Sequence, residues 1–137
     1  MMLKNKVAIV TGGTRGIGFA VVKKFIENGA AVSLWGSRQE TVDQALEQLK
    51  ELYPDAKISG KYPSLKDTAQ VTAMINQVKE EFGAVDILVN NAGISQSTSF
   101  YNYQPEEFQK IVDLNVTAVF NCSQAAAKIM KRAGREA

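Results

Sequence analysis

The chain has 137 residues, 45% of them hydrophobic and 22% charged, which predicts a single globular domain with one buried core. The formal net charge of +2 is spread along the sequence, which argues against nucleic acid or an anionic membrane as partner, and no apolar run approaches the roughly 20 residues of a membrane span. Cys122 is the single cysteine and histidine is absent, so an internal disulfide, a histidine-ligated metal and a Ser-His-Asp triad are excluded, and we expect a cytoplasmic protein without a metal site.

Short apolar runs alternate with stretches of helical period along the whole chain, which is the pattern of repeated βα units around a parallel sheet. In chain order, this pattern predicts strands at 6–10, 30–35, 57–62 and 85–90, followed respectively by helices at 17–28, 42–52, 71–82 and 105–131. A polar loop at 91–102 precedes the last helix. Right-handed crossovers give the strand order 3-2-1-4. The predicted fold class is therefore α/β, a doubly wound parallel sheet of about four strands.

A glycine-rich turn, TGGTRGIG at 11–18, lies between the first strand and the first helix. A helix N-terminus presents backbone N–H groups and a positive dipole to a phosphate, and Gly16 and Gly18 would leave the approach open. The turn lacks the GK[ST] of a P-loop, which argues against an NTPase. Two interpretations remain open: a phosphate-binding turn, and glycines that serve only a tight βα connection.

Three motifs in order resemble those of the short-chain dehydrogenase/reductase family. They are T-G-x-x-x-G-x-G at 11–18, NNAG at 90–93, and Asn115 within IVDLNV. The resemblance implies a Rossmann-like NAD(P)-binding domain over 1–137, corresponding to the N-terminal part of the family fold. The sequence around the motifs, in the segments ENGAAVSLWG and ALEQLKELYP, is similar to that of bacterial 3-oxoacyl-acyl-carrier-protein reductases and of hydroxysteroid dehydrogenases, including those acting on bile acids.

The resemblance also implies which residues surround a nicotinamide dinucleotide. They are Gly12, Thr14, Arg15, Gly16, Ile17, Gly18, Ser64, Leu65, Asn91, Ala92 and Gly93. Ser64 stands where the family usually has aspartate, so the bond to the adenine amine would lack a carboxylate's charge. Asn90 is expected either to stitch strands together or to contact the cofactor.

The choice of cofactor is expected to depend on the segment after the second strand. NAD enzymes carry an acidic side chain there, which binds the ribose hydroxyls and repels a 2′-phosphate. This chain offers Ser37 and Arg38, with Arg15 approaching from the glycine turn. A hydroxyl and two guanidinium groups favour NADP(H) over NAD(H). The alternative is that Arg38 is only a solvated surface charge.

The resemblance places the catalytic serine, tyrosine and lysine of the family beyond a fifth strand, after the residues of this chain. Of the catalytic set only Asn115 is expected here, in a supporting role. The parent enzyme would transfer hydride between NADP(H) and a ketone or secondary alcohol of 3-oxoacyl or hydroxysteroid type, and this chain alone is expected to be inactive. The alternative is a non-enzymatic nucleotide-binding or assembly module. A receiver-type signalling domain is a more distant third, because Tyr62 and Pro63 stand where it needs aspartate.

Two apolar surfaces predict a homo-oligomer. The strand at 85–90 would lie at a sheet edge, and Ile87, Leu88 and Val89 include no lysine or proline to discourage pairing with another chain. The helix at 105–131 carries apolar residues that one copy could bury only in part. These are Val112, Val116, Val119 and Phe120. The simplest expectation is a two-fold dimer through the strand, the helix, or both.

Overall fold

The computed structural model describes residues 1–93 and 99–134, so that positions 94–98 of the expected polar loop and the last three residues lie outside it. Every predicted strand and helix is present. The elements are β1 (Val7–Thr11), α1 (Gly16–Glu27), β2 (Ala31–Trp35), α2 (Gln39–Leu52), β3 (Ile58–Lys61), α3 (Thr68–Phe82), β4 (Ile87–Val89), the 3-10 helix η1 (Phe100–Asn102), α4 (Pro105–Val112), the π-helical segment η2 (Asp113–Thr117) and α5 (Ala118–Arg132).

The four strands form one parallel sheet in the order β3-β2-β1-β4, which confirms the predicted fold class and strand order. In the register of the sheet, Thr11 at the end of β1 pairs with Trp35 at the end of β2. The carboxyl ends of the strands therefore meet at one edge, from which the loops leading to the helices depart. On the outer side of β1, Val10 pairs with Val89, so β4 is an edge strand of the described sheet.

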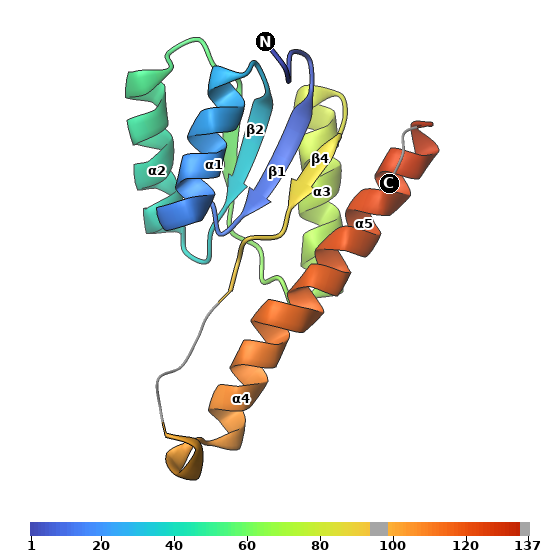
Figure 1. Ribbon diagram of the computed structural model, residues 1–137. Helices are drawn as coiled ribbons and strands as arrows, with labels where there is room; N and C mark the ends of the chain where they lie inside the picture. Colours follow the sequence, from blue (N-terminus) through green and yellow to red (C-terminus); the bar gives the residue numbers. More distant parts are fainter. Residues whose placement is uncertain (94–98, 135–137) are drawn as a thin grey trace.

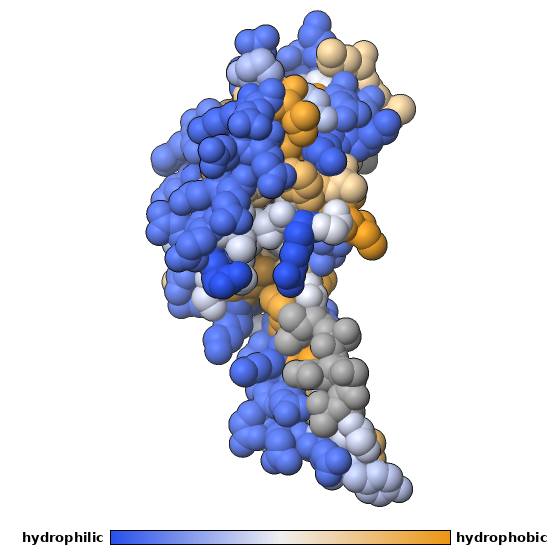
Figure 2. All heavy atoms as spheres, turned by 90° about the vertical axis from the view of Figure 1, so that its left-hand side faces the viewer, coloured by the Kyte–Doolittle hydropathy of each residue, from blue (hydrophilic) through white to orange (hydrophobic). Residues whose placement is uncertain are grey.

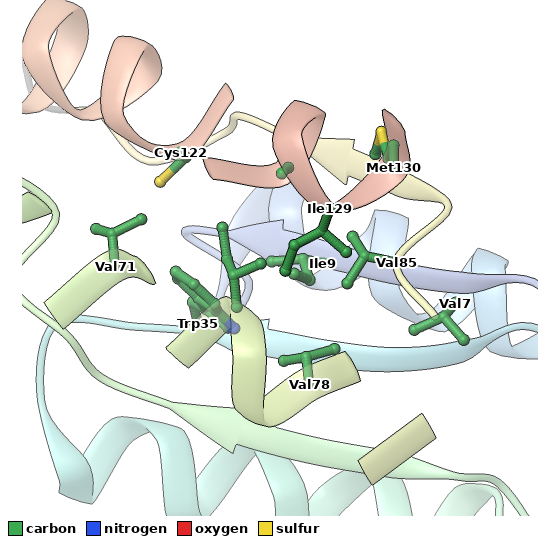
Figure 3. Close-up of a cluster of buried hydrophobic side chains, with 11 residues drawn as sticks. Val7, Ile9, Trp35, Val71, Val78, Val85, Cys122, Ile129 and Met130 are labelled. Atoms are coloured by element: carbon green, nitrogen blue, oxygen red, sulfur yellow. The ribbon is translucent and has the colours of Figure 1, made fainter. Parts of the chain in front are cut away.

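Helices cover both faces of the sheet (Figure 1). On one face, α1 and α2 pack their apolar stripes on the strands, and Val22, Leu34 and Leu49 are fully buried there. On the other face, α3 and α5 enclose a second cluster (Figure 3), in which Ile9 and Trp35 lie beneath the two helices. Burial of these side chains accounts for most of the driving force for folding, at about 1.5–3 kcal/mol for each large apolar residue.

Local signals fix the ends of the helices. Asp67 caps α3 by accepting hydrogen bonds from the backbone N–H groups of Ala69 at 3.0 Å and Gln70 at 3.2 Å. Gly83, with φ of 88°, ends the same helix in the left-handed conformation. Pro105 occupies the first turn of α4, where its missing N–H costs no hydrogen bond.

The helix expected at 105–131 is helical throughout but is divided by a change of hydrogen-bond pattern. The segment η2 has π-helical bonding between α4 and α5. Figure 1 shows α5 packed beside β4 and α3, while α4 extends past the carboxyl edge of the sheet. A π-type turn holds one more residue than an α-type turn, and such segments are frequent at functional sites.

The surface on the α2 side of the molecule is mostly hydrophilic, as Figure 2 shows. Exposed charged residues on α2, such as Glu40, Glu47 and Lys50, contribute to it. Among the helices that the structure describes, none combines the length and apolar character needed to cross a membrane.

Candidate functional site

A buried hydroxyl joins the ends of β1 and β4. Thr11 is 1% exposed, and its Oγ1 accepts hydrogen bonds from the backbone N–H groups of Asn91 and Ala92, both at 3.1 Å. The same hydroxyl donates to the carbonyl of Val89 at 3.4 Å. The two backbones are therefore fixed to each other at the strand ends, where open α/β sheets bind their ligands.

The side chain of Asn91 anchors the glycine-rich turn. Its Nδ2 donates to the carbonyl of Gly12 at 3.0 Å. Gly18 passes so close to this contact that an added Cβ would lie 2.0 Å from the Gly12 oxygen and 2.5 Å from Asn91 Nδ2. Only glycine fits at position 18, because a side chain there would separate α1 from the end of β4.

The N-terminus of α1 opens toward solvent. Arg15 is its N-cap residue in an extended conformation, and the Arg15 side chain makes no capping hydrogen bond. The first turn carries no acidic residue, and a Cβ added at Gly16 would meet no atom within 4 Å. The positive end of the helix dipole and the first backbone N–H groups are thus accessible to an anion.

The segment after β2 lies against the same turn. The methyl group of Thr14 would be 2.6 Å from a Cβ added at Gly36, and Val42 on α2 would be 2.8 Å away. Ser37 and Arg38 follow and are exposed, and Arg38 is the extended N-cap residue of α2. The packing of Thr14 on Gly36 therefore links the glycine turn to the loop that carries Ser37 and Arg38.

The loop after β3 is held by two side-chain amides. The backbone N–H of Ser64 donates to Gln70 Oε1 at 2.9 Å, and the carbonyl of Leu65 accepts from Asn121 Nδ2 at 3.0 Å. Leu65 packs against the core, while Ser64 is exposed at the carboxyl edge of the sheet. The backbone at 64–65 is consequently tied to both α3 and α5.

Comparison with known proteins identifies the family. Residues 6–136 match the family model for short chain dehydrogenase. The chain belongs to the short-chain dehydrogenase family. This result confirms the family that the three motifs indicated.

Two curated relatives agree with this assignment. A 3alpha-hydroxysteroid dehydrogenase of Mediterraneibacter gnavus is 98% identical over 134 residues, which are 98% of this chain and 54% of the relative. A 3-oxoacyl-[acyl-carrier-protein] reductase of Chlamydia muridarum is 35% identical over 132 residues, covering 96% of this chain and 53% of the relative. The chain thus spans about half the length of the curated relatives it matches.

The solved structures give the same relation. The crystal structure of levodione reductase superposes with a TM-score of 0.90 at 30% identity, covering 98% of this chain and 52% of that one. A short-chain dehydrogenase/reductase from Mycobacterium marinum also gives a TM-score of 0.90, at 33% identity. The fold of this chain is therefore the Rossmann-like fold of about half of each of these structures.

Membership of the short-chain dehydrogenase family implies a nicotinamide cofactor. The residues predicted to contact it follow the carboxyl ends of the four strands, in the connecting loops and in the first turn of α1. These are Gly12, Thr14, Arg15, Gly16, Ile17 and Gly18 after β1, Ser37 and Arg38 after β2, Ser64 and Leu65 after β3, and Asn91, Ala92 and Gly93 after β4. Their individual roles remain predictions.

Asn115, the predicted supporting residue of the short-chain dehydrogenase motif, lies in η2. Its Oδ1 is close to the backbone after β4, since a Cβ added at Gly93 would lie 2.9 Å from it. Asn90 is expected to join strand ends, but Asn91 does so instead, through its bond to the Gly12 carbonyl. Asn90 Nδ2 donates to Ser123 Oγ on α5 at 3.1 Å. Asn90 therefore joins β4 to a helix and not to another strand.

In the family's catalytic motif the lysine follows the tyrosine by four residues. Two pairs in this chain have that spacing, Tyr53 with Lys57 and Tyr62 with Lys66. Neither pair lies within a helix, where side chains four residues apart share a face. Tyr53 is the C-cap of α2, and the segment from 62 to 66 is a loop. The spacing alone therefore does not reproduce the catalytic pair of a short-chain dehydrogenase.

Among the described residues, Tyr53 and Cys122 have pKa values raised by their surroundings. Donation of a hydrogen bond to Glu27 at 2.5 Å, followed by burial, raises the pKa of Tyr53. Burial raises the pKa of the Cys122 thiol to about 11, so this side chain is neutral at pH 7 within the core. No group of three acidic, cysteine or histidine side chains suited to a metal occurs in the described residues.

Sequence patterns missed three polar residues that shape the site. The glycine motif includes Thr11 only as its first residue, whereas its hydroxyl joins two strands. Gln70 and Asn121 hold the loop after β3, and Asn121 is 56 positions away from Leu65 in the chain. The only available signal was the polar character of Asn121 within a helix that is otherwise largely buried on one face.

Proposed function

We propose that the chain is the NAD(P)-binding domain of a short-chain dehydrogenase and binds the pyrophosphate of a nicotinamide dinucleotide at the N-terminus of α1. The observation that supports this function most directly is the accessible first turn of α1, with no acidic residue and no side-chain cap. The absence of a Cβ at Gly18 and Gly16 keeps the turn close to α1 and leaves room for a phosphate. The donor set fits a dianionic pyrophosphate.

In the proposed reaction, the residues of this chain bind the dinucleotide and orient it. The N–H groups of the first turn of α1 would hold the pyrophosphate, and Thr11 and Asn91 keep that turn fixed relative to β4. A bound reduced nicotinamide supplies the hydride that converts a ketone to a secondary alcohol. By similarity to the 3alpha-hydroxysteroid dehydrogenase, we propose a hydroxysteroid as the substrate class of the whole enzyme, with a 3-oxoacyl group as the alternative.

We further propose that the cofactor is NADP(H). Position 36 carries no acidic side chain, and a Cβ added at Gly36 would lie 2.6 Å from Thr14 and 2.8 Å from Val42, so a larger residue would require both side chains to move. The exposed guanidinium groups of Arg15 and Arg38, on adjacent loops, supply positive charge for a 2′-phosphate. The cytoplasmic location expected from the sequence also remains a prediction.

The chain is proposed to act as a homo-oligomer. Along α4, η2 and α5, Phe108 is 58%, Val116 62% and Phe120 55% exposed, which is a large apolar area for a single copy to leave in water. The first turn of α4 is acidic and the last turn of α5 is basic, so an antiparallel second copy would bring opposite charges together. β4 offers a shorter second surface at the edge of the described sheet.

A substitution at Ile17 separates nucleotide binding from folding. Ile17 is 78% exposed in the first turn of α1, so glutamate there would suit the helix dipole while repelling a pyrophosphate. We expect Ile17→Glu to weaken NADPH binding at least about tenfold relative to the neutral control Ile17→Gln, with the unfolding midpoint retained. Fluorescence titration and thermal unfolding measure the two quantities. Equal affinities, or no NADPH binding by the unsubstituted chain, would contradict the proposed function.

A further inference from the structure

One side chain on α5, that of Asn121, makes hydrogen bonds with both its amide nitrogen and its amide oxygen near the loop after β3. Asn121 Nδ2 donates to the carbonyl of Leu65 at 3.0 Å, and the hydroxyl of Thr68 donates to Asn121 Oδ1 at 3.4 Å. Leu65 lies in the loop and Thr68 is the first residue of α3. The amide of Asn121 therefore joins α5 to the loop and to the helix that follows it.

The loop has few other attachments. Ser64, Lys66 and Asp67 are exposed, and its apolar anchors are the buried Pro63 and the half-buried Leu65. Within the described residues, its backbone is held by one backbone hydrogen bond, from Asp67 N–H to the Ser64 carbonyl at 3.1 Å, and by two bonds with side chains, from Ser64 N–H to Gln70 and from Asn121 to Leu65. Removing the Asn121 donor would leave a partly buried carbonyl without its partner.

The loop also carries a free polar group at the carboxyl edge of the sheet. Within the part of the chain that the structure describes, the Ser64 hydroxyl makes no hydrogen bond and is exposed. A serine hydroxyl is short and neutral, so its bond to a ligand requires closer positioning than a carboxylate would. A backbone held in advance lowers the cost of making that bond.

We propose that Asn121 is a positioning residue for nucleotide binding, which holds the backbone at 64–65 so that the Ser64 hydroxyl meets the adenine amine. The proposal rests on the function proposed above. It assigns α5 a part in recognition of the base through the bonds of Asn121 to Leu65 and Thr68. Gln70 holds the same backbone from the side of α3.

The first test measures the loop in the free chain. Asn121→Leu removes the donor, and Gln124→Leu is the matched control, since Gln124 is an exposed amide on α5 that lines a groove between α3 and α5 together with Asn121. We expect hydrogen exchange of the amides at 64–67 to quicken about five- to tenfold in Asn121→Leu and to stay unchanged in the control. Unchanged exchange in Asn121→Leu would overturn the proposal.

The second test measures recognition of the base. The probes are NADPH and its hypoxanthine analogue, which lacks the adenine amine. We expect the unsubstituted chain to prefer NADPH, and Asn121→Leu to lower the ratio of the two affinities toward one, as Ser64→Ala does. The double variant should show no further loss, because both changes remove the same contact.

The ratio separates positioning from general loss of stability. A merely structural role would weaken both nucleotides equally and leave their ratio intact, and that result would overturn the proposal while leaving nucleotide binding established. If the unsubstituted chain binds neither nucleotide, the proposed function fails and the positioning role fails with it. An unchanged ratio in Ser64→Ala would also refute the contact with the adenine amine.

Discussion

In the proposed function, the charge of Arg38 selects the cofactor. Arg38 caps α2 with its backbone while its side chain is exposed, so substitution there leaves the core untouched. Arg15 supplies a second guanidinium group from the turn after β1. The absence of an acidic side chain at Gly36 complements these charges in the proposal, because a carboxylate there would favour NAD(H).

We predict that Arg38→Asp reverses the cofactor preference. The unsubstituted chain should bind NADPH more tightly than NADH, and the variant should prefer NADH. Loss of a charge-assisted bond costs about 1.5–3 kcal/mol, which corresponds to about tenfold or more in affinity. Titration of both nucleotides measures the ratio, and Lys50→Asp, near the other end of α2, is the control for net charge. Equal affinities for NADPH and NADH in the unsubstituted chain would refute the assignment.

At the scale of the elements, the π-helical segment η2 separates a helix that packs on the sheet, α5, from one that extends past it, α4. The buried residues of α5 include Cys122, Ala126 and Ile129, which face the sheet. The α4 helix has no fully buried residue and extends past the sheet. Because a π-type turn changes the phase of the helix, the apolar stripe of α4 need not continue the buried stripe of α5.

The homo-oligomer is better tested by a substitution on the exposed apolar residues of α4, η2 and α5 than by one on β4. We predict that the chain is a dimer at micromolar concentration and that Phe120→Glu disperses it, because the change places a charge in the proposed contact. Light scattering measures the mass, and Gln124→Glu is the charge control on another exposed position of α5. A monomer before substitution would refute the oligomer. Leu88→Lys would be a poorer test, since Leu88 packs against the core and its loss would also affect folding.

Local pattern sufficed for most elements but not for every boundary. The alternation of apolar runs located β1 and β2 to within one residue at their ends, because both are buried along their whole length or nearly so. The last strand was expected at 85–90 and is Ile87–Val89. Before it, Val85 is buried in the core and Asp86 turns its carboxylate to the backbone N–H of Val7 at 2.8 Å. This contact spans 79 positions and has no local signature.

The candidate site shows the same division. Glycine spacing predicted the turn before α1, because close approach of backbones restricts the residue type locally. Asn115 could be placed in a helix, but its position in a π-helical segment beside Gly93 depends on packing across the fold. The bond between Asn121 and Leu65 was beyond sequence reasoning, because hydrogen bonds between distant segments follow from tertiary structure.

For the whole molecule, we predict binding without turnover. The described residues include the proposed nucleotide site, but neither Tyr53 nor Tyr62 lies with its lysine on one helical face to act as a proton donor. Oxidation of NADPH by the chain in the presence of a keto-steroid should therefore stay at the background rate. Absorbance at the nicotinamide band measures it. Turnover that disappears in Tyr53→Phe or Tyr62→Phe would contradict the prediction and identify the acid.

The core contains an optical reporter for these measurements. Trp35 is the single tryptophan of the chain, is 1% exposed, and donates a hydrogen bond through Nε1 to Ser33 Oγ at 3.0 Å. Its ring lies in the cluster beneath α3 and α5, so its emission follows the docking of these helices on the sheet (Figure 3). A ligand that binds only the folded chain raises the free energy of unfolding, by about 2.7 kcal/mol at a hundred times its Kd. The unfolding midpoint rises as a result. The emission of one native indole can therefore rank nucleotides and variants without any added label.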